Sequence, residues 1–306
     1  MKPQITRFIF HCEIEKKLSS KTIKAYKLDL KQFSIFFNDK DIKNLTKDDL
    51  KKYFLELSKY APRTIKRKIA TLKTFFSYQE FEEEIEINPF HKVRTKVKLD
   101  TTLPNTLCVQ EIQQIFKAIY DDEKLFSLKG GYKYKEIVRN IAVLELLLAS
   151  GIRVSELCSL KMYNVSGNFS LIKVIGKGSK ERTIPITNQD TLKALQSNFK
   201  LFKGEIENTS FFFINRFGNP LSEQSVRFMV KKYAKRAKIK RTITPHVFRH
   251  SFATLLLEEE VDIRYIQHLL GHSSINITQI YTHVNEKKKK EILLIKSPRN
   301  LIRLSE

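Results

Sequence analysis

The chain has 306 residues, of which 42% are hydrophobic and 29% are charged, and its 56 Lys and Arg against 33 Asp and Glu give a net charge of +23. This composition excludes an intrinsically disordered chain, and the length predicts two domains, each large enough for its own core. Because such a charge excess repels itself, it predicts a polyanionic partner, namely DNA, RNA or anionic lipid. No apolar run approaches the roughly 20 residues of a membrane span.

Cysteine usage and the N-terminal residues indicate a cytoplasmic protein. The three cysteines, Cys12, Cys108 and Cys158, are scattered and form no Cys-x-x-Cys pair. This favours a reducing compartment over a disulfide framework or a cysteine-rich zinc site. Residues 1–11 lack the apolar core and the small-residue cleavage site of a secretion leader.

Residues 1–90 are predicted to form a helical domain. After the polar start at Ser19 and Ser20, apolar residues recur at steps of three and four, which is typical of one helical stripe. They are Ile23, Tyr26, Leu30, Phe33 and Phe37. Thr46 and Asp49 form a capping-box pattern that starts a second helix.

A third helix is predicted to begin at Pro62, which suits a first turn. Its apolar stripe consists of Ile65, Ile69, Leu72 and Phe76. At about 100° per residue, four basic residues fall on a different arc and become candidate nucleic-acid contacts: Arg63, Lys66, Arg67 and Lys73. An ordinary solvated surface helix is the alternative.

An extended basic linker over residues 91–105 is predicted to follow Asn88-Pro89-Phe90 and to lead into a second domain over residues 106–306. Helices are predicted there over 109–121, 137–149, 188–200, 222–237, 246–258, 262–270 and 275–281. Residues 169–175 and 182–186 read as a β-hairpin around a Gly-Lys-Gly turn. The fold class is therefore mainly α with a small antiparallel β-sheet, arranged as a two-domain clamp.

Two segments in different domains are basic and contain no acidic residue. Residues 58–79 carry six basic side chains, and residues 225–257 carry nine, with Lys231 and Lys235 as candidate DNA contacts. Two such segments favour a bipartite grip on nucleic acid. An amphipathic membrane helix is disfavoured, because aromatic residues do not line one edge of either segment.

Several familiar sites can be set aside. Gly176-Lys177-Gly178 lacks the glycine four residues before the Gly-Lys pair and lies between strands, so it is not a nucleotide loop. His246 and His250 have helical spacing, but Val247 stands where a zinc protease needs glutamate. A metal site and a serine or cysteine nucleophile are therefore not predicted, and Cys158 is expected to belong to the core.

What remains in the second domain suits attack at a phosphodiester. Its transition state needs cations on the non-bridging oxygens, an in-line nucleophile and a proton donor for the departing oxygen. The candidates are Arg153, with Glu156 three residues on to orient it, Lys177 at the hairpin tip, His246 and Arg249 on one helical face, His272 after Gly271, and Tyr281. Taken singly, each has an ordinary structural explanation, such as a salt bridge or packing.

Taken together, four segments in order resemble the hallmark motifs of the tyrosine recombinases, most closely those of the Xer type and related integrases. They are SGIRVSEL (150–157), GKGSKERTIPI (176–186), HVFRHSFATLLL (246–257) and LGHSSINITQIYTHV (270–284). The resemblance covers nearly the whole chain, because residues 1–90 look like the helical core-binding domain of that family.

The resemblance implies a role for each of six residues. Tyr281 would attack the scissile phosphate and form a 3′-phosphotyrosyl link, while Lys177 protonates the leaving 5′ oxygen. Arg153 and Arg249 would hold the non-bridging oxygens. His246 would assist proton transfer at the tyrosine, and His272 would bind the phosphate. The family needs no cofactor, neither ATP nor metal, because the phosphotyrosine conserves the bond.

The resemblance also implies partners. The expected ones are double-stranded DNA with inverted half-sites, a homotetramer on two duplexes or a tetramer shared with a paralogue, a Holliday-junction intermediate, and a DNA translocase. Chromosome dimer resolution is the expected role, and integration or transposition of a mobile element is the alternative. A type IB topoisomerase and a DNA-binding protein without catalysis are less favoured.

Two segments depart from the Xer pattern. The family's C-terminal segment usually docks into a neighbouring protomer, but residues 286–290 and 297–300 are unusually basic here. Residues 121–135 look longer than the matching Xer loop, and no role is assigned to them.

Overall fold

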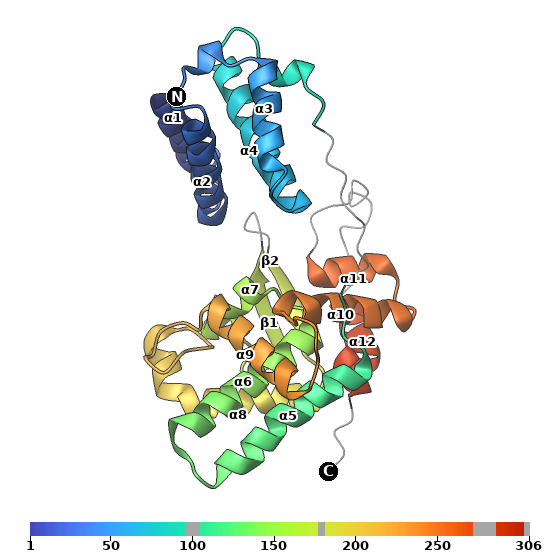
Figure 1. Ribbon diagram of the computed structural model, residues 1–306. Coiled ribbons are helices and arrows are strands. Elements are labelled where there is room, and N and C mark those ends of the chain that lie inside the picture. Colours follow the sequence, from blue (N-terminus) through green and yellow to red (C-terminus); the bar gives the residue numbers. More distant parts are fainter. Residues whose placement is uncertain (96–104, 177–180, 272–285, 303–306) are drawn as a thin grey trace. The chain divides into compact units, whose positions relative to one another are not determined.

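The computed structural model describes residues 1–95, 105–176, 181–271 and 286–302, and only the backbone of residues 286–289. The chain divides into two compact units, Met1–Thr102 and Leu103–Glu306. Figure 1 shows helices α1–α4 in the first unit, and the remaining labelled helices with strands β1 and β2 in the second.

The first unit is helical, as predicted. Its elements are α1 (Lys2–Ile14), α2 (Ser20–Phe36), the 3₁₀ turn Ile42–Asn44, α3 (Lys47–Leu57), α4 (Pro62–Phe81) and the 3₁₀ turn Pro89–Lys92. The Ser19 side chain caps α2, Thr46 and Asp49 form the expected capping box of α3, and Pro62 lies in the first turn of α4. Helix α1 is absent from the predicted elements, although Phe8 and Cys12 contribute buried side chains to this core.

The predicted end of the first domain is part of its packing. Phe90 is buried in the core of this unit, and Val93 packs against the same cluster. The Asn88 side chain accepts a hydrogen bond from the backbone of Phe90 at 3.0 Å. The first residues beyond Asn88 therefore close the helical core.

The second unit is mainly helical and carries one small sheet. Its helices are α5 (Val109–Ser127), α6 (Gly131–Ser150), α7 (Val154–Cys158), α8 (Gln189–Thr209), α9 (Glu223–Arg236), α10 (Pro245–Glu258), α11 (Ile263–Leu270) and α12 (Glu286–Lys296). Two 3₁₀ turns, Met162–Asn164 and Pro298–Leu301, complete its helical elements among the described residues. Every residue of α6 from Ile137 to Ser150 is buried, so this helix forms the centre of the unit.

Strands β1 (Leu171–Ile175) and β2 (Glu181–Pro185) form the predicted antiparallel hairpin. Ile172 pairs with Ile184, and Ile175 pairs with Glu181 at the end of the ladder. The buried residues of β1 alternate along the strand, which places Ile172 and Val174 on the core.

The interpretation of residues 121–135 as a long loop is wrong. Helix α5 continues to Ser127 and α6 begins at Gly131, so the connection is short. The polar residues that suggest a loop include Asp122, which is buried and accepts hydrogen bonds from Tyr233, at 3.1 Å, and from Arg236. The acidic residue thus fastens α5 to α9.

The basic residues near the C-terminal end also have an inward role. Arg299 is 1% exposed, and its Nε donates to the buried Glu145 carboxylate of α6 at 2.6 Å. Its Nη2 reaches Asp190 at 3.2 Å, and the guanidinium lies 5.1 Å from the centre of the Phe116 ring. This segment is therefore anchored on the protein's own second unit.

In the part of the chain that the structure describes, no helix is long and apolar enough to cross a membrane.

Candidate active site

The site begins where α6 stops, at a glycine that the local geometry requires. Gly151 caps the helix in the left-handed conformation with φ of 59°. A β-carbon at this position would lie 2.6 Å from the Phe252 ring and 2.7 Å from a methyl group of Leu270. Only glycine meets both conditions, and the turn it makes delivers Arg153 at the N-terminus of α7.

Arg153 and Glu156 form the ion pair that their spacing predicts. The Arg153 Nη1 donates to Glu156 Oε1 at 2.8 Å, and the Arg153 backbone N–H donates to Oε2 at 3.0 Å. The Arg153 Nη2 donates to the Gly271 carbonyl at 2.9 Å, and the side chain remains 29% exposed. The guanidinium is therefore fixed on one side and accessible on the other.

Sequence reasoning missed a third arginine, Arg182 of β2. Its Nη1 and Nη2 donate to the two oxygens of Glu156, both at 2.8 Å, in a bidentate pair, and its Nε donates to the Leu269 carbonyl at 3.0 Å. The signal was present in the segment Lys-Glu-Arg-Thr, but its contact with Glu156 depends on how the hairpin packs. Glu156 thus holds two arginines where one was expected.

The ionisation of Glu156 follows from these contacts. Burial opposes the charged form, but the hydrogen bonds and charge of Arg182, together with the hydrogen bonds of Arg153, outweigh burial and lower the pKa of Glu156 to about 2. The carboxylate is therefore ionised throughout the physiological range.

Arg249 of α10 lies against the same turn. Its Nη1 donates to the Gly151 carbonyl at 2.6 Å, and its Nη2 donates to the Leu270 carbonyl at 2.5 Å. The side chain is buried, and burial together with the positive charge of Arg153 lowers its pKa to about 9, so it stays protonated at neutral pH. Among the described residues it has no carboxylate within ion-pair distance.

The charge balance of this cluster favours an anion. Two guanidinium groups, those of Arg153 and Arg182, bind the carboxylate of Glu156, and a third, that of Arg249, lies against the same turn. Backbone carbonyls of Gly151, Leu270 and Gly271 fix them but contribute no net charge. A partly buried excess of about two positive charges, carried by the planar donor groups of arginine, suits a bound phosphate.

His246 lies one turn from Arg249, at the N-terminus of the same helix α10. Burial, followed by the positive charges of His250 and Arg249, lowers its pKa from the ordinary histidine value. The imidazole is therefore neutral near pH 7 and able to accept a proton.

Three predicted catalytic residues, Lys177, His272 and Tyr281, lie outside the described residues. Lys177 falls in the sequence between the paired residues Ile175 and Glu181. His272 follows Gly271, whose carbonyl accepts the Arg153 hydrogen bond. The described residues that directly precede Lys177 and His272 thus belong to the hairpin that carries Arg182 and to the arginine cluster.

The candidate DNA contacts of the first unit lie on one exposed face of α4. Arg63, Lys66, Arg67 and Lys73 are all exposed, whereas Ile69, Leu72 and Phe76 are buried. The separation of basic and apolar arcs is confirmed. Lys68, which belongs to the same basic run, instead points inward and is 2% exposed.

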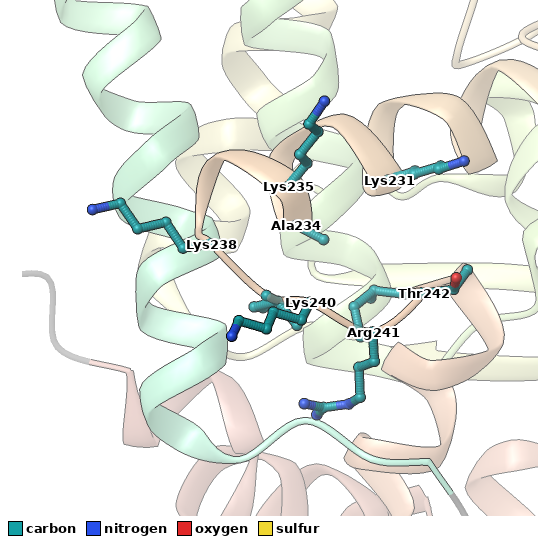
Figure 2. A pocket seen from close by; sticks show the side chains of 9 residues that line it. Lys231, Ala234, Lys235, Lys238, Lys240, Arg241 and Thr242 are labelled. Carbon is teal, nitrogen blue, oxygen red and sulfur yellow. The ribbon is translucent and has the colours of Figure 1, made fainter.

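The candidate contacts of the second unit border a basic surface pocket. Lys231, Lys235, Lys238 and Lys240 line it together with Arg241. Figure 2 shows Lys231 and Lys235 on the ribbon of α9 and Arg241 reaching toward the segment that leads into α5. There Arg241 donates to Glu111, at 2.6 Å from Nη2, and to the Thr106 carbonyl at 2.7 Å. The lysines are therefore the cations of this pocket that remain for a ligand.

Metal ligands do not gather in the described parts of the chain. No group of three or more His, Cys, Asp or Glu side chains there could hold an ion.

Comparison with known families gives two matches that together span most of the chain. Residues 105–288 match the model of the phage integrase family, and residues 5–83 match the model of the phage integrase N-terminal SAM-like domain.

Named relatives match almost from end to end. A tyrosine recombinase of Agathobacter rectalis is 43% identical over 300 residues, which are 98% of this chain and 97% of the relative. The tyrosine recombinase XerC of Thermodesulfovibrio yellowstonii is 38% identical over 295 residues, which are 94% of each chain.

Among solved structures, the site-specific recombinase XerH, captured on a palindromic difH substrate after cleavage, superposes with a TM-score of 0.69 at 23% identity. The match covers 95% of this chain and 83% of XerH. At this identity, the superposition shows a shared fold.

Proposed function

The chain belongs to the phage integrase family and is a tyrosine recombinase, an enzyme that cuts and rejoins DNA strands, and we propose that it acts at a specific site through a 3′-phosphotyrosyl link. The observation that carries this proposal is that Arg153, Arg182 and Arg249 gather at the turn after α6, where Glu156 binds only the first two of them. Its surplus positive charge suits the pentacoordinate phosphate of strand transfer.

In the proposed cleavage step, the Tyr281 oxygen attacks the scissile phosphorus and the bond to the 5′ oxygen breaks. The tyrosine proton leaves toward His246, whose lowered pKa supports a neutral, proton-accepting imidazole. Lys177 gives its proton to the departing 5′ oxygen, which becomes a free hydroxyl. Arg153 and Arg249 bind the non-bridging oxygens, with His272 as a further hydrogen-bond donor.

Rejoining reverses these bonds. The 5′ hydroxyl of a partner strand attacks the phosphotyrosine, the tyrosine leaves and recovers a proton, and Lys177 accepts the proton of the attacking hydroxyl. Because one phosphoester bond is exchanged for another at each step, the reaction is close to isoenergetic. The proposed mechanism therefore needs neither ATP nor metal.

Both units take part in binding double-stranded DNA in this proposal. Residues 1–90 form the core-binding domain, residues 91–105 the basic linker, and residues 106–306 the catalytic domain. Arg63, Lys66, Arg67 and Lys73 on α4, and Lys231 and Lys235 on α9, contact the duplex. Their exposure, and the excess of cations over acids around them, support this role.

For the biological role, we favour Xer-type recombination of chromosome dimers over integration of a mobile element. Relatives named XerC match nearly the whole chain. In this role, four protomers act on two duplexes with inverted half-sites and pass through a Holliday junction, alone or with a paralogue. A DNA translocase is a further proposed partner.

The function is tested by trapping the covalent complex. The full chain is incubated with candidate duplexes, each nicked close to the scissile phosphate. After cleavage, the short fragment that carries the free 5′ hydroxyl diffuses away and cannot be rejoined. We expect a protein–DNA adduct that survives denaturation and is absent from Arg249→Ala. If the protein binds cognate duplexes specifically but forms no adduct with any of them, the result would support a DNA-binding protein without catalysis.

A further inference from the structure

One of the basic residues on the exposed face of α4 differs from the other three. Arg63, Lys66 and Lys73 make no hydrogen bond or ion pair within the described residues. Arg67 instead donates from Nη1 to the Asp29 carboxylate of α2. Its Nε and Nη2 edge makes no further hydrogen bond there, and the side chain is 41% exposed.

The carboxylate that holds Arg67 is itself fixed. Asp29 is 1% exposed, and its Oδ1 accepts a hydrogen bond from Lys68 Nζ at 3.1 Å. Its Oδ2 accepts one from Thr71 Oγ1 at 3.1 Å in addition to the bond from Arg67. With partners on both oxygens, the carboxylate cannot turn, so it fixes the position of the Arg67 Nη1 group.

The pair keeps a positive charge for a ligand. Lys68 is buried beside Asp29, lies 5.1 Å from the centre of the Tyr60 ring, and balances the aspartate charge. The charge of Arg67 is therefore not cancelled by Asp29. A cation that is held at one nitrogen and keeps a free donor edge has lost part of its conformational entropy before binding, which favours a directional contact.

The surface around Arg67 lets DNA approach closely. Ala70 and Thr74, both exposed and small, lie along the middle of the basic face of α4. At about 100° per residue, Lys66 and Lys73 border them on one side and Arg67 on the other. Small residues between flanking cations suit a helix that lies in a groove with phosphates at its edge.

From this arrangement we infer that Arg67, held by Asp29, reads a guanine base in the major groove, whereas Lys66 and Lys73 bind phosphates. The Nε and Nη2 edge would donate to the O6 and N7 acceptors of guanine. The inference rests on the proposed function, because it names which residue of the DNA-binding face selects sequence.

The test compares two neighbouring variants that lose the same charge, Arg67→Gln and Lys66→Gln, in the full chain. Each protein and the wild type selects from a library of duplexes with a randomised stretch, and affinities for the enriched sequences are measured against salt. Chemical unfolding of each variant verifies that α4 remains folded. Adduct formation by the wild type on the enriched, nicked duplex is scored separately.

We expect Arg67→Gln to lose about tenfold or more in discrimination at one G·C pair while leaving the other positions unchanged. Lys66→Gln should weaken binding to all sequences alike and lower the salt slope by about 1. If Arg67→Gln keeps every base preference of the wild type, the inference fails while the adduct still supports the recombinase. If the wild type enriches no sequence, Arg67 reads no base and the inference also fails.

Discussion

Glu156 connects the parts of the active site that lie far apart in the chain. It binds Arg153 three residues away and Arg182 of the hairpin, and its charge acts on the buried Arg249. The pair with Arg153 could be predicted from sequence, because residues three apart on a helix start are neighbours. The pair with Arg182 could not, since it arises only when the hairpin packs beside α7.

Glu156 also makes the stability of the protein depend on acidity. Its pKa is depressed from 4.5 to about 2 on folding. The stability that it contributes is therefore fully present above about pH 4.5 and is lost as the pH falls toward 2. By linkage, this contribution is about 3 kcal/mol.

We therefore expect Glu156→Gln to be clearly less stable than wild type at neutral pH, with a difference that narrows between about pH 4.5 and pH 2. Urea unfolding across this range measures it. Glu86→Gln, which alters an exposed carboxylate, serves as the control and should follow the wild type throughout. A wild-type advantage over Glu156→Gln that persists unchanged to pH 2 would contradict the assigned pKa.

At the scale of elements, the join between α6 and α7 is the least tolerant point of the site. Gly151 combines a left-handed backbone with close contacts to Phe252 and Leu270, and its carbonyl accepts the Arg249 hydrogen bond. A side chain there strains the turn and displaces the carbonyl that holds Arg249.

Gly151→Ala is therefore expected to lower the free energy of unfolding by about 2 kcal/mol or more, through backbone strain and overpacking. Gly204→Ala is the matched control, because Gly204 lies within α8 with open space around its α-carbon. That change should be neutral or stabilising by up to about 1 kcal/mol. Denaturant unfolding of both variants measures these changes. Equal changes in the free energy of unfolding would show that the contacts around Gly151 do not matter for stability.

The elements that could be predicted are those with strong local signals. Ser19, the Thr46–Asp49 box and Pro62 mark helix starts that the structure confirms, and β-branched residues on both sides of a Gly-Lys-Gly turn mark the hairpin. Residues 121–127 lie in α5 and not in a loop, and the buried contact of Asp122 with Arg236 and Tyr233 that fixes them is tertiary. The burial of Arg299 could not be predicted from sequence either, because only its contact with Glu145 in the folded protein distinguishes it from a solvated cation.

At the scale of the whole molecule, the net charge of +23 has separable parts. Some cations, such as Arg236, Arg241 and Arg299, hold elements together through acidic partners. In the proposed function, Arg153 and Arg249 bind the scissile phosphate. In the proposed function, Lys231 and Lys235 instead provide sequence-independent attraction to phosphates, which depends on salt.

If different cations serve binding and chemistry, some substitutions should weaken DNA binding and others should abolish cleavage. Lys231→Gln combined with Lys235→Gln should lower the salt slope of DNA binding by about 2 and leave the chemistry of the bound complex intact. Arg249→Ala should instead abolish cleavage while binding changes far less. Binding at several salt concentrations and single-turnover cleavage separate the two effects, with Lys193→Gln combined with Lys200→Gln on α8 as the control that loses the same two charges. If all these changes weakened binding equally and nothing else, the division would be wrong.

In the proposed function, Tyr281 carries the DNA during strand exchange, and peptide mapping of the trapped complex identifies the residue that is joined to the DNA. The denatured adduct is digested with protease, and the peptide that remains attached to the DNA is sequenced by mass spectrometry. We predict that the 3′ phosphate is esterified to Tyr281 and that Tyr281→Phe forms no adduct while still binding the duplex. A linkage to any other residue, or an equal yield of adduct from Tyr281→Phe, would contradict the account.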